Sequence, residues 1–387
     1  MRPCLFILLI AFAILPLSAA PVYSPTWGFR LDLPEDYELT EGNGRDRFSF
    51  QGPNGTRFDI AVYSGVYQNI TQMAGDINRR LGNTGEGANP QLFDYGDKAA
   101  ALMELRFGNY AGWGLCVELD GGTTNESGQP GQRPLLLALS YAPSGTRGLE
   151  LYHMSALDSI IPSKTEQRHP GPIMEFGFPR GEKKLTGLAL TGINAMIREG
   201  DAEAAQTLID REFALLRLYQ SADNWQEAWI RFYRVIYRDS WDRVADAVFQ
   251  LERFWNVEVK SNADKEMNER ALAEKALAWV QGFSYERDFA GSDFVNLVSA
   301  LTEGRGDCDS RAMLWALILT QANIPAAIMV SREHSHAMGL ADISGAGARF
   351  EAGGTKWLVA ETTANVNIGL IAQNVSDIES WLAVLFD

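Results

Sequence analysis

The stretch GRGDCDSRAMLWALILTQANIPA, residues 304 to 326, decides the fold of this chain. Its two glycines permit a tight turn, and Asp307 after them is a residue type that caps helix N-termini. The apolar run from Ala312 to Leu319 then predicts a buried helix that ends before Pro325. Cys308 therefore falls in the first turn of this helix, where we expect a reactive thiol.

The position of Cys308 has opposing effects on its ionisation. Unpaired backbone N–H groups and the helix dipole at an N-terminus favour the thiolate, which lowers the thiol pKa from its usual value of about 8.5. The neighbouring Asp307 and Asp309 act in the other direction, because nearby negative charge disfavours a thiolate. A nearby imidazolium would decide this balance in favour of the thiolate.

The chain has four histidines that could supply this imidazole. His153 and His169 lie far upstream near an apparent linker, and His169 is expected to be exposed to solvent. His334 and His336 instead follow the cysteine helix by one short predicted strand, residues 326–330. The second pair is therefore the better source of a catalytic base.

His336 is the stronger candidate of the two. It opens the segment HAMGLADI, residues 336–343, which reads as a strand, while His334 lies in the polar loop SREHS. A further predicted strand, KWLVAETTA, leads to Glu361. A carboxylate at the end of the strand beside His336 could accept its ring N–H and fix its tautomer.

These separated features together resemble the transglutaminase-like superfamily of papain-fold thiol enzymes. The resemblance consists of Gly-x-Gly-x-Cys opening an apolar helix, NIPA after it, a histidine opening the next strand, and W-x-V-x-acid-x-T after that, over about residues 265–370. It implies that Cys308 is the nucleophile, His336 the general base and acid, and Glu361 the orienting carboxylate. The family more often has Asp in the third place, and Glu reaches one methylene further.

The resemblance also implies an oxyanion donor upstream of the cysteine. In the segment AWVQGFSYERD the candidate side chains are Gln281 and Tyr285. The backbone N–H of Cys308 is the third candidate donor.

The predicted function is that of an exported cysteine enzyme that attacks an amide carbonyl and forms a thioester. A peptidase or amidase is favoured over transfer to an amine, and the expected partner is a protein or peptide substrate. A non-catalytic binding or scaffold protein that keeps the three residues without turnover is the alternative. Redox chemistry ranks last because the chain has no Cys-x-x-Cys.

No metal or cofactor is expected. Glu333, His334 and His336 form a cluster of ligand types, but no fourth ligand follows at a spacing typical of zinc sites. The chain also lacks a P-loop and a dinucleotide-binding fingerprint.

Residues 1–20, MRPCLFILLIAFAILPLSAA, predict a secretory signal peptide, with retention as an uncleaved anchor as the alternative. No later segment has the run of apolar residues that a membrane-spanning helix needs, so the mature chain is expected to be exported, to the periplasm or outside the cell. The net charge of −15 and the pI of about 4.8 argue against nucleic acid and anionic membranes as partners. Pairing of Cys116 with Cys308 stays open, although the two are predicted to lie in different domains.

The fold class is α+β, in five predicted segments. After the signal peptide, residues 21–163 read as strands, a helix, three strands and a closing helix, which predicts an antiparallel sheet with helices on one side. This pattern resembles PsbP-like sandwich domains, and such a domain is expected to bind another protein or a ligand. Residues 164–184 form a linker, 185–262 a helical region and 263–387 the transglutaminase-like domain.

Within the helical region, breaks are expected near Gly200, Asp223 and Asp239. An aromatic stripe repeats at spacings of three and four residues there, which is more typical of core packing than of a ligand groove. A capping box at residues 376–379 predicts a short C-terminal helix. The stripe consists of Trp225, Trp229, Phe232, Tyr233 and Ile236.

Overall fold

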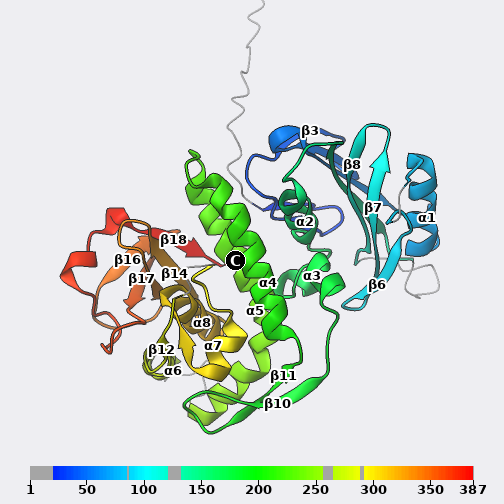
Figure 1. Cartoon of the computed structure of the whole chain (residues 1–387). Coiled ribbons are helices and arrows are strands. Elements are labelled where there is room, and N and C mark those ends of the chain that lie inside the picture. Colours follow the sequence, from blue (N-terminus) through cyan, green and yellow to red (C-terminus); the bar gives the residue numbers. More distant parts are fainter. Residues whose placement is uncertain (1–20, 85–86, 121–131, 256–264, 288–291, 387) are drawn as a thin grey trace, which may run out of the picture.

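A computed structural model describes residues 21–84, 87–120, 132–255, 265–287 and 292–386. The predicted signal peptide at residues 1–20 lies outside the described residues. The fold is mixed α+β, as predicted, with one sheet on each side of the long helix α5 (Trp225–Trp255) (Figure 1). Among the described residues, no helix is long and apolar enough to cross a membrane.

The N-terminal part is built on one antiparallel sheet with the strand order β3-β4-β5-β9-β8-β7-β6. A turn at residues 52–56 joins β4 to β5, and Asn54 within it has a positive φ of 55°. A short additional pair, β1 (Val22–Tyr23) and β2 (Arg30–Leu31), precedes the sheet. The sheet strands are β3 (Glu38–Gly42), β4 (Arg47–Gln51), β5 (Arg57–Tyr63), β6 (Gln91–Tyr95), β7 (Lys98–Phe107), β8 (Tyr110–Glu118) and β9 (Leu135–Pro143).

The two helices of this part are divided between the two faces of the sheet, where the sequence pattern had placed both on one side. Side chains along β7 alternate, so Ala101 and Met103 pack with α1 (Ile70–Leu81), while Leu102 packs with the α2 side. Helix α2 (Glu150–Asp158) thus covers the opposite face from α1 (Figure 1). Both faces are apolar, because each is covered.

The segment predicted as a linker packs against the N-terminal sheet. It contains η2 (Thr165–Arg168) and α3 (Pro172–Gly177). The rings of Phe93 in β6 and Phe176 in α3 lie 5.3 Å apart. Buried Lys98 donates to Glu166 at 2.9 Å, which fixes the start of the segment.

The predicted helical region begins with a hairpin, not a helix. Strands β10 (Lys183–Gly187) and β11 (Asn194–Arg198) pair antiparallel around Gly192, whose φ is 74°. Helices α4 (Asp201–Leu216), η3 (Arg217–Tyr219) and α5 then follow.

The break expected near Asp239 is absent, because α5 continues through that position. Asp239 forms a bidentate pair with Arg243 one turn later, at 2.9 Å for both contacts. Such an i,i+4 pair supports a continuous helix.

The C-terminal part packs helices against a second antiparallel sheet of order β16-β17-β15-β14-β18. Its helices and short strands before the sheet are α6 (Lys265–Gln281), β12 (Ser284–Tyr285), α7 (Leu297–Glu303), β13 (Arg305–Gly306) and α8 (Cys308–Gln321). The sheet strands are β14 (Ala326–Ser331), β15 (His336–Ala341), β16 (Arg349–Ala352), β17 (Thr355–Ala360) and β18 (Leu382–Leu385).

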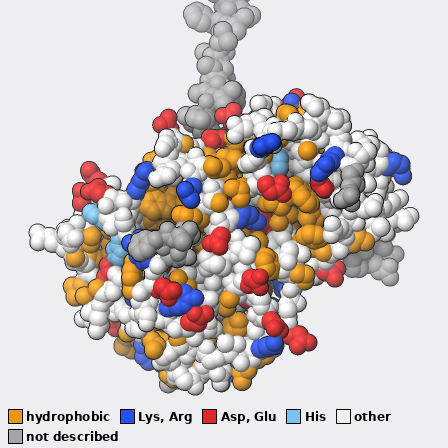
Figure 2. Space-filling view, viewed as in Figure 1, with side chains coloured by type: hydrophobic (Ala, Val, Ile, Leu, Met, Phe, Trp, Pro, Cys, Tyr) orange, Lys and Arg blue, Asp and Glu red, His pale blue; other side chains and the backbone are white. Residues whose placement is uncertain are grey.

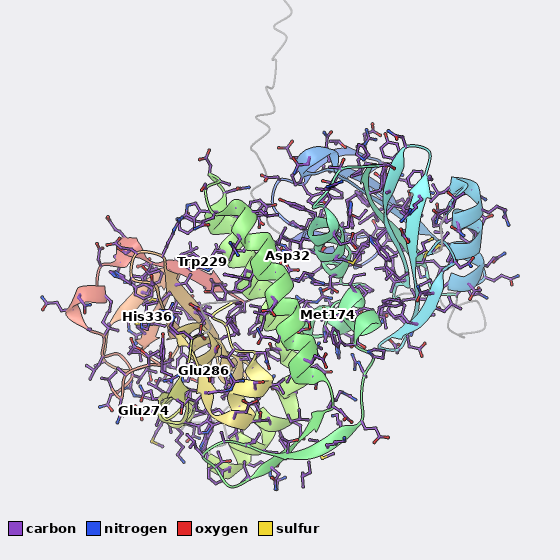
Figure 3. The ribbon with its side chains drawn as sticks, viewed as in Figure 1. Asp32, Met174, Trp229, Glu274, Glu286 and His336 are labelled. Carbon is purple, nitrogen blue, oxygen red and sulfur yellow. The ribbon has the colours of Figure 1, made fainter. Side chains whose placement is uncertain are left out.

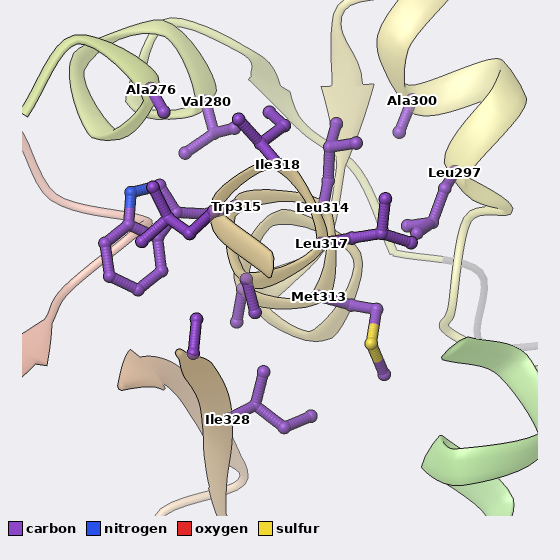
Figure 4. Close-up of a cluster of buried hydrophobic side chains, with 14 of the residues drawn as sticks. Ala276, Val280, Leu297, Ala300, Met313, Leu314, Trp315, Leu317, Ile318 and Ile328 are labelled. Carbon is purple, nitrogen blue, oxygen red and sulfur yellow. The ribbon is translucent and has the colours of Figure 1, made fainter. Parts of the chain in front are cut away.

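Helix α8 is the centre of this part and is buried on all sides (Figure 4). Trp315 is fully buried, and its indole N–H donates to the carbonyl of Ala273 in α6 at 3.0 Å. On the other side of α8, Ile328 of β14 belongs to the same hydrophobic cluster. This packing holds the N-terminus of α8, and therefore Cys308, in a fixed place.

The predicted C-terminal helix is wrong. Short 3-10 turns, η4 (Gln373–Val375) and η5 (Ile378–Ser380), occupy that region, and β18 follows them and pairs with β14. Asp377 does cap the second turn, accepting from the Glu379 N–H at 3.1 Å. After this turn the chain forms a strand at the edge of the sheet instead of a helix. A capping signal is local and does not predict such pairing with a distant strand.

Candidate active site

Cys308 is the first residue of α8, as the sequence predicts. Asp307 caps the helix through a carboxylate oxygen that accepts from the Ser310 N–H at 2.8 Å. The Ser310 hydroxyl also accepts from the Val295 N–H at 2.9 Å, which ties the preceding loop to the helix. The first-turn N–H groups, including that of Cys308, have no acceptor within the helix.

His336 and Glu361 form the expected hydrogen bond. The Nε2 atom of His336 lies 2.8 Å from Oε2 of Glu361. The other oxygen of Glu361 accepts from the N–H of Thr363 at 2.7 Å and from its hydroxyl at 2.6 Å. The threonine of the W-x-V-x-acid-x-T pattern thus holds the carboxylate in place.

These contacts determine the tautomer of His336. Burial by itself would raise the pKa of Glu361. The hydrogen bond and charge of His336, together with the hydrogen bonds from Thr363, have the larger effect and lower the pKa. An ionised Glu361 can only accept, so Nε2 of His336 must donate. In the neutral ring Nδ1 is then unprotonated and can take a proton.

The thiol of Cys308 lies against the beginning of β15. The N–H of Ala337, the residue after His336, donates to the sulfur, and the charge of His336 acts on Asp309. Figure 3 shows His336 in the C-terminal part, at the sheet that contains β15. The fold therefore gathers the predicted cysteine, histidine and acid at one end of α8.

The pKa of the Cys308 thiol is raised, where the helix position had suggested a lowered value. Burial is the largest cause, since the residue is only 3 % exposed, and the charges of Asp309 and Asp307 add to it. The Ala337 N–H and the charge of Arg287 act in the lowering direction but do not compensate. A thiolate here needs the positive charge of a protonated His336.

Of the two candidate oxyanion donors, Gln281 is already occupied by other hydrogen bonds. Both amide hydrogens of Gln281 are used, because its Nε2 donates to the carbonyls of Glu361 at 2.8 Å and Val366 at 2.9 Å. Gln281 therefore fixes the loop that carries Glu361 and is not available to an oxyanion.

Tyr285 lies beside Cys308. Its hydroxyl is hydrogen-bonded to the Cys308 thiol, and burial together with that neighbour raises the pKa of Tyr285 to about 12. The ring is 52 % exposed, and the guanidinium of buried Arg311 lies 5.4 Å from its centroid. Arg311 also donates to the carbonyls of Gly306 and Phe283, which shapes the turn before the cysteine.

An acidic pair flanks the thiol. Burial, and then the charge of Asp309, raises the pKa of Asp307 well above its ordinary value, and burial also raises that of Asp309. The Tyr233 hydroxyl on α5 donates to Asp309 at 2.9 Å, while Oδ2 of Asp307 is buried without a donor. Burial therefore disfavours two full negative charges beside the thiol. The contact with α5 could not be read from the sequence, because it joins residues far apart in the chain.

Among the described residues, Asp307, Cys308 and Asp309 are also the group that could hold a metal ion, since one ligand atom from each lies within 4.8 Å of the others. A cation there would compete with protons for these three side chains. The cluster weighed in the sequence, Glu333 with His334 and His336, is not such a group.

The remaining histidines and the second cysteine lie away from this end of α8. His153 is buried next to the Ser140 hydroxyl at 2.9 Å, and burial lowers its pKa to about 4. His169 is half-buried beside Asp242, at 3.5 Å, where the sequence had suggested full exposure. Cys116 and Cys308 are both free thiols, and Cys116 lies in the core of the N-terminal sheet.

Comparisons with known proteins give weak likenesses. No family model and no curated protein matches the chain. Calcium-bound LapG from Legionella pneumophila is 14 % identical over 46 % of this chain and 81 % of its own, with a TM-score of 0.22. The "Putative Cysteine Protease from Cytophaga hutchinsonii" is 11 % identical over 85 % of this chain and 80 % of its own, with a TM-score of 0.21.

A third structure, described as a "putative protease from Parabacteroides distasonis", is 9 % identical over 70 % of this chain and 67 % of its own, with a TM-score of 0.21. None of these three is a PsbP-like protein, so that resemblance of the N-terminal part is unsupported.

Proposed function

We propose that this protein is a cysteine enzyme that cleaves amide bonds in peptides through a thioester on Cys308. The observation that carries the proposal is the 2.8 Å hydrogen bond from His336 to Glu361 next to a thiol at a helix N-terminus. A carboxylate that fixes an imidazole tautomer has little structural use by itself, whereas it sets a general base for catalysis.

In the proposed reaction, Nδ1 of His336 takes the thiol proton and the sulfur of Cys308 attacks the amide carbonyl. The resulting oxyanion accepts hydrogen bonds from the Cys308 N–H and the Tyr285 hydroxyl. His336 then returns the proton to the departing amine as the C–N bond breaks, which leaves an acyl group on the sulfur. Water adds to this thioester in the hydrolytic reaction and restores the free thiol.

A primary amine in place of water would give transamidation. Both outcomes use the same three residues, and the choice depends on how well water is excluded. We favour hydrolysis, in line with the expectation for an exported protein. Export itself is part of the proposal, because the predicted signal segment lies outside the described residues.

A non-catalytic scaffold is the second candidate, and the burial of the thiol favours it. Cys308 is 3 % exposed, and burial raises its pKa, so an isolated thiol in this place would react slowly. In that case Glu361 and His336 would be a structural pair that joins β15 to the loop after β17.

The test is to incubate the full chain with a mixture of peptide amides and to search for acyl adducts by mass spectrometry after an acid quench. The proposal expects an adduct on Cys308 that hydroxylamine removes, and free peptide acids that accumulate with time. Cys308→Ala should show neither, and an added primary amine should report transamidation.

Alkylation with iodoacetamide from pH 4 to 9 separates the two candidates. Selective labelling of Cys308, slowed in His336→Ala, supports the enzyme. Cys116 is the internal control, because it is fully buried and its pKa is raised to about 12. Failure of both adduct formation and Cys308 labelling in the folded protein would support the scaffold.

A further inference from the structure

Three aromatic rings form a ladder along one face of α5, and we call Trp225, Trp229 and Tyr233 the aromatic ladder. The ring centroids of the two tryptophans lie 5.8 Å apart, and those of Trp229 and Tyr233 lie 6.2 Å apart. Their spacing of four residues places them on one helix face. The ladder is part of the stripe that the sequence favoured as core.

The ladder differs in burial from the rest of that stripe. Phe232 and Ile236 are buried in the core, at 5 % and 1 % exposed, as expected for packing. Trp225 and Trp229 are only half-buried. Trp229 packs with part of its surface against the large core cluster of the C-terminal part, whereas Trp225 belongs to none of the hydrophobic clusters of the described residues. Both rings therefore keep some apolar surface open beside the core.

The inner end of the ladder reaches the candidate nucleophile. Tyr233 is buried, and its hydroxyl donates to Asp309, the residue after Cys308. Figure 3 shows Trp229 on the side of α5 that faces the sheet carrying His336. On the same face of the molecule, hydrophobic side chains gather between α5 and the C-terminal sheet, next to a histidine (Figure 2).

The turn that leads to the candidate base meets the outer end of the ladder. Arg332, in the turn between β14 and β15, places its guanidinium 5.3 Å from the ring centroid of Trp225 and donates to the Gln220 carbonyl at 3.3 Å. His336 follows this turn. The outer tryptophan is therefore linked to the reacting groups along α5 through Tyr233 and along this turn through His336.

We infer that the aromatic ladder is a substrate subsite, which binds a large apolar side chain of an extended peptide whose amide carbonyl lies at Cys308. This inference rests on the proposed function. Eight residues of helix from Trp225 to Tyr233 span about 12 Å, which matches about four residues of extended chain. The guanidinium of Arg332 disfavours a basic side chain at the outer end, so the occupant is apolar, followed by neutral or acidic residues.

The test uses tetrapeptidyl acyloxymethyl ketones, which alkylate active-site thiols, with iodoacetamide as a probe that has no side chain. In each of the four positions in turn, Phe, Leu, Gly or Lys is placed in an otherwise fixed sequence. The rate of Cys308 alkylation in the full chain is followed by intact-mass spectrometry. At one position at least, Phe and Leu should react about tenfold faster than Gly, the effect of burying one apolar side chain, and Lys should be slowest at the outer end.

Substitutions of tryptophans on α5 test whether the aromatic ladder causes this preference. Trp229→Ala should reduce the preference for Phe over Gly to about twofold or less, while the iodoacetamide rate stays within about twofold of wild type. Trp229→Phe, which keeps a ring, should retain most of the preference. Trp241→Ala is the matched control, because Trp241 is another half-buried tryptophan of α5 that contacts Arg168 and not the ladder.

Equal rates for Phe and Gly at all four positions, with Cys308 labelled normally by iodoacetamide, would overturn the subsite but leave the proposed function standing. A preference that Trp229→Ala does not change would also overturn it. No labelling of Cys308 by any probe would instead count against the proposed function itself.

Discussion

At the residue scale, Glu361 determines which nitrogen of His336 carries the proton. Glu361→Gln keeps the size of the side chain but presents an amide that can orient its NH₂ toward the ring, so the tautomer with a basic Nδ1 is no longer fixed. We expect acylation of Cys308 to slow by roughly 10⁴-fold, the loss seen when a triad acid becomes an amide. The measurement is the rate of peptide acid release, with folding checked by circular dichroism.

Two further variants test the reason for this loss. Thr363→Val removes one hydrogen bond to Glu361 and should cost far less, about tenfold, because the Thr363 N–H remains. Glu361→Asp keeps the charge and should retain more activity than Glu361→Gln. Equal activity of Glu361→Gln and wild type would show that the His336 contact is structural.

Tyr285 carries the second prediction at this scale. Its pKa is raised to about 12, by burial first and by Cys308 next, so the hydroxyl stays protonated and able to donate throughout pH 5 to 10. Tyr285→Phe should therefore lower peptide cleavage by about 10²-fold, the usual loss for one oxyanion donor, without moving the pH profile. Rates of iodoacetamide labelling should change much less, because alkylation forms no oxyanion. A loss confined to high pH would contradict this role.

At the element scale, α8 and β15 approach each other at one residue that has to be glycine. A Cβ on Gly339 would lie 2.4 Å from the Trp315 ring, which is itself fully buried. Gly339→Ala should lower the free energy of unfolding by about 1–3 kcal/mol, as overpacking typically does. Urea denaturation of the full chain measures this change.

Gly75→Ala in α1 is the matched control. A Cβ there meets no atom within 4 Å, and the position is helical, so the change should be neutral or stabilising by about 0.5–1 kcal/mol. If Gly339→Ala also proves neutral, the ring of Trp315 must move without cost. Cys308 labelling in the same variants would show whether the start of α8 moves with it.

Sequence reasoning located the elements that carry the site but not all of its contacts. Cys308 and His336 sit at element boundaries marked by local signals, a cap and a change of periodicity, and Glu361 closes a clear strand. Gln281 was misassigned because its two acceptors lie 80 and 85 residues further along the chain. The hairpin at residues 183–198 and strand β18 depend on pairing partners, which local propensity does not specify.

At the scale of the whole molecule, charged groups join the N-terminal part to α5. Arg234 pairs with Asp32 at 2.7 Å, and buried Arg231 donates to Glu212 and to the Ser155 hydroxyl of α2. Figure 3 shows Asp32 next to α5. Since α5 also carries the tyrosine that contacts Asp309, the N-terminal sheet is fixed to the element that forms one wall beside the thiol.

Glu35 is a buried carboxyl group at this junction that lacks a full set of hydrogen-bond partners. Its backbone carbonyl accepts from the Tyr219 hydroxyl at 2.8 Å, but its buried Oε1 has no donor. Burial raises the pKa of Glu35 to about 7, the charge of Asp32 adds to the rise, and Arg231 opposes it. Because the folded pKa lies above the unfolded one, the contribution of Glu35 to stability is complete below about pH 4.5 and is lost as pH rises to about 7.

Glu35→Gln should remove this loss, since a neutral side chain has no proton to release on unfolding. The difference in unfolding free energy between variant and wild type should therefore rise by up to about 3 kcal/mol from pH 4.5 to pH 8, in favour of the variant. Urea denaturation of both proteins at several pH values measures this difference. The other titrating groups contribute equally to both proteins, so their contributions cancel. Glu166→Gln supplies the contrast, because Glu166 accepts from buried Lys98 at 2.9 Å and its replacement should destabilise across the same range. A Glu35→Gln curve parallel to wild type would mean that Glu35 is already charged in the folded protein, with Arg231 as its effective partner across the junction.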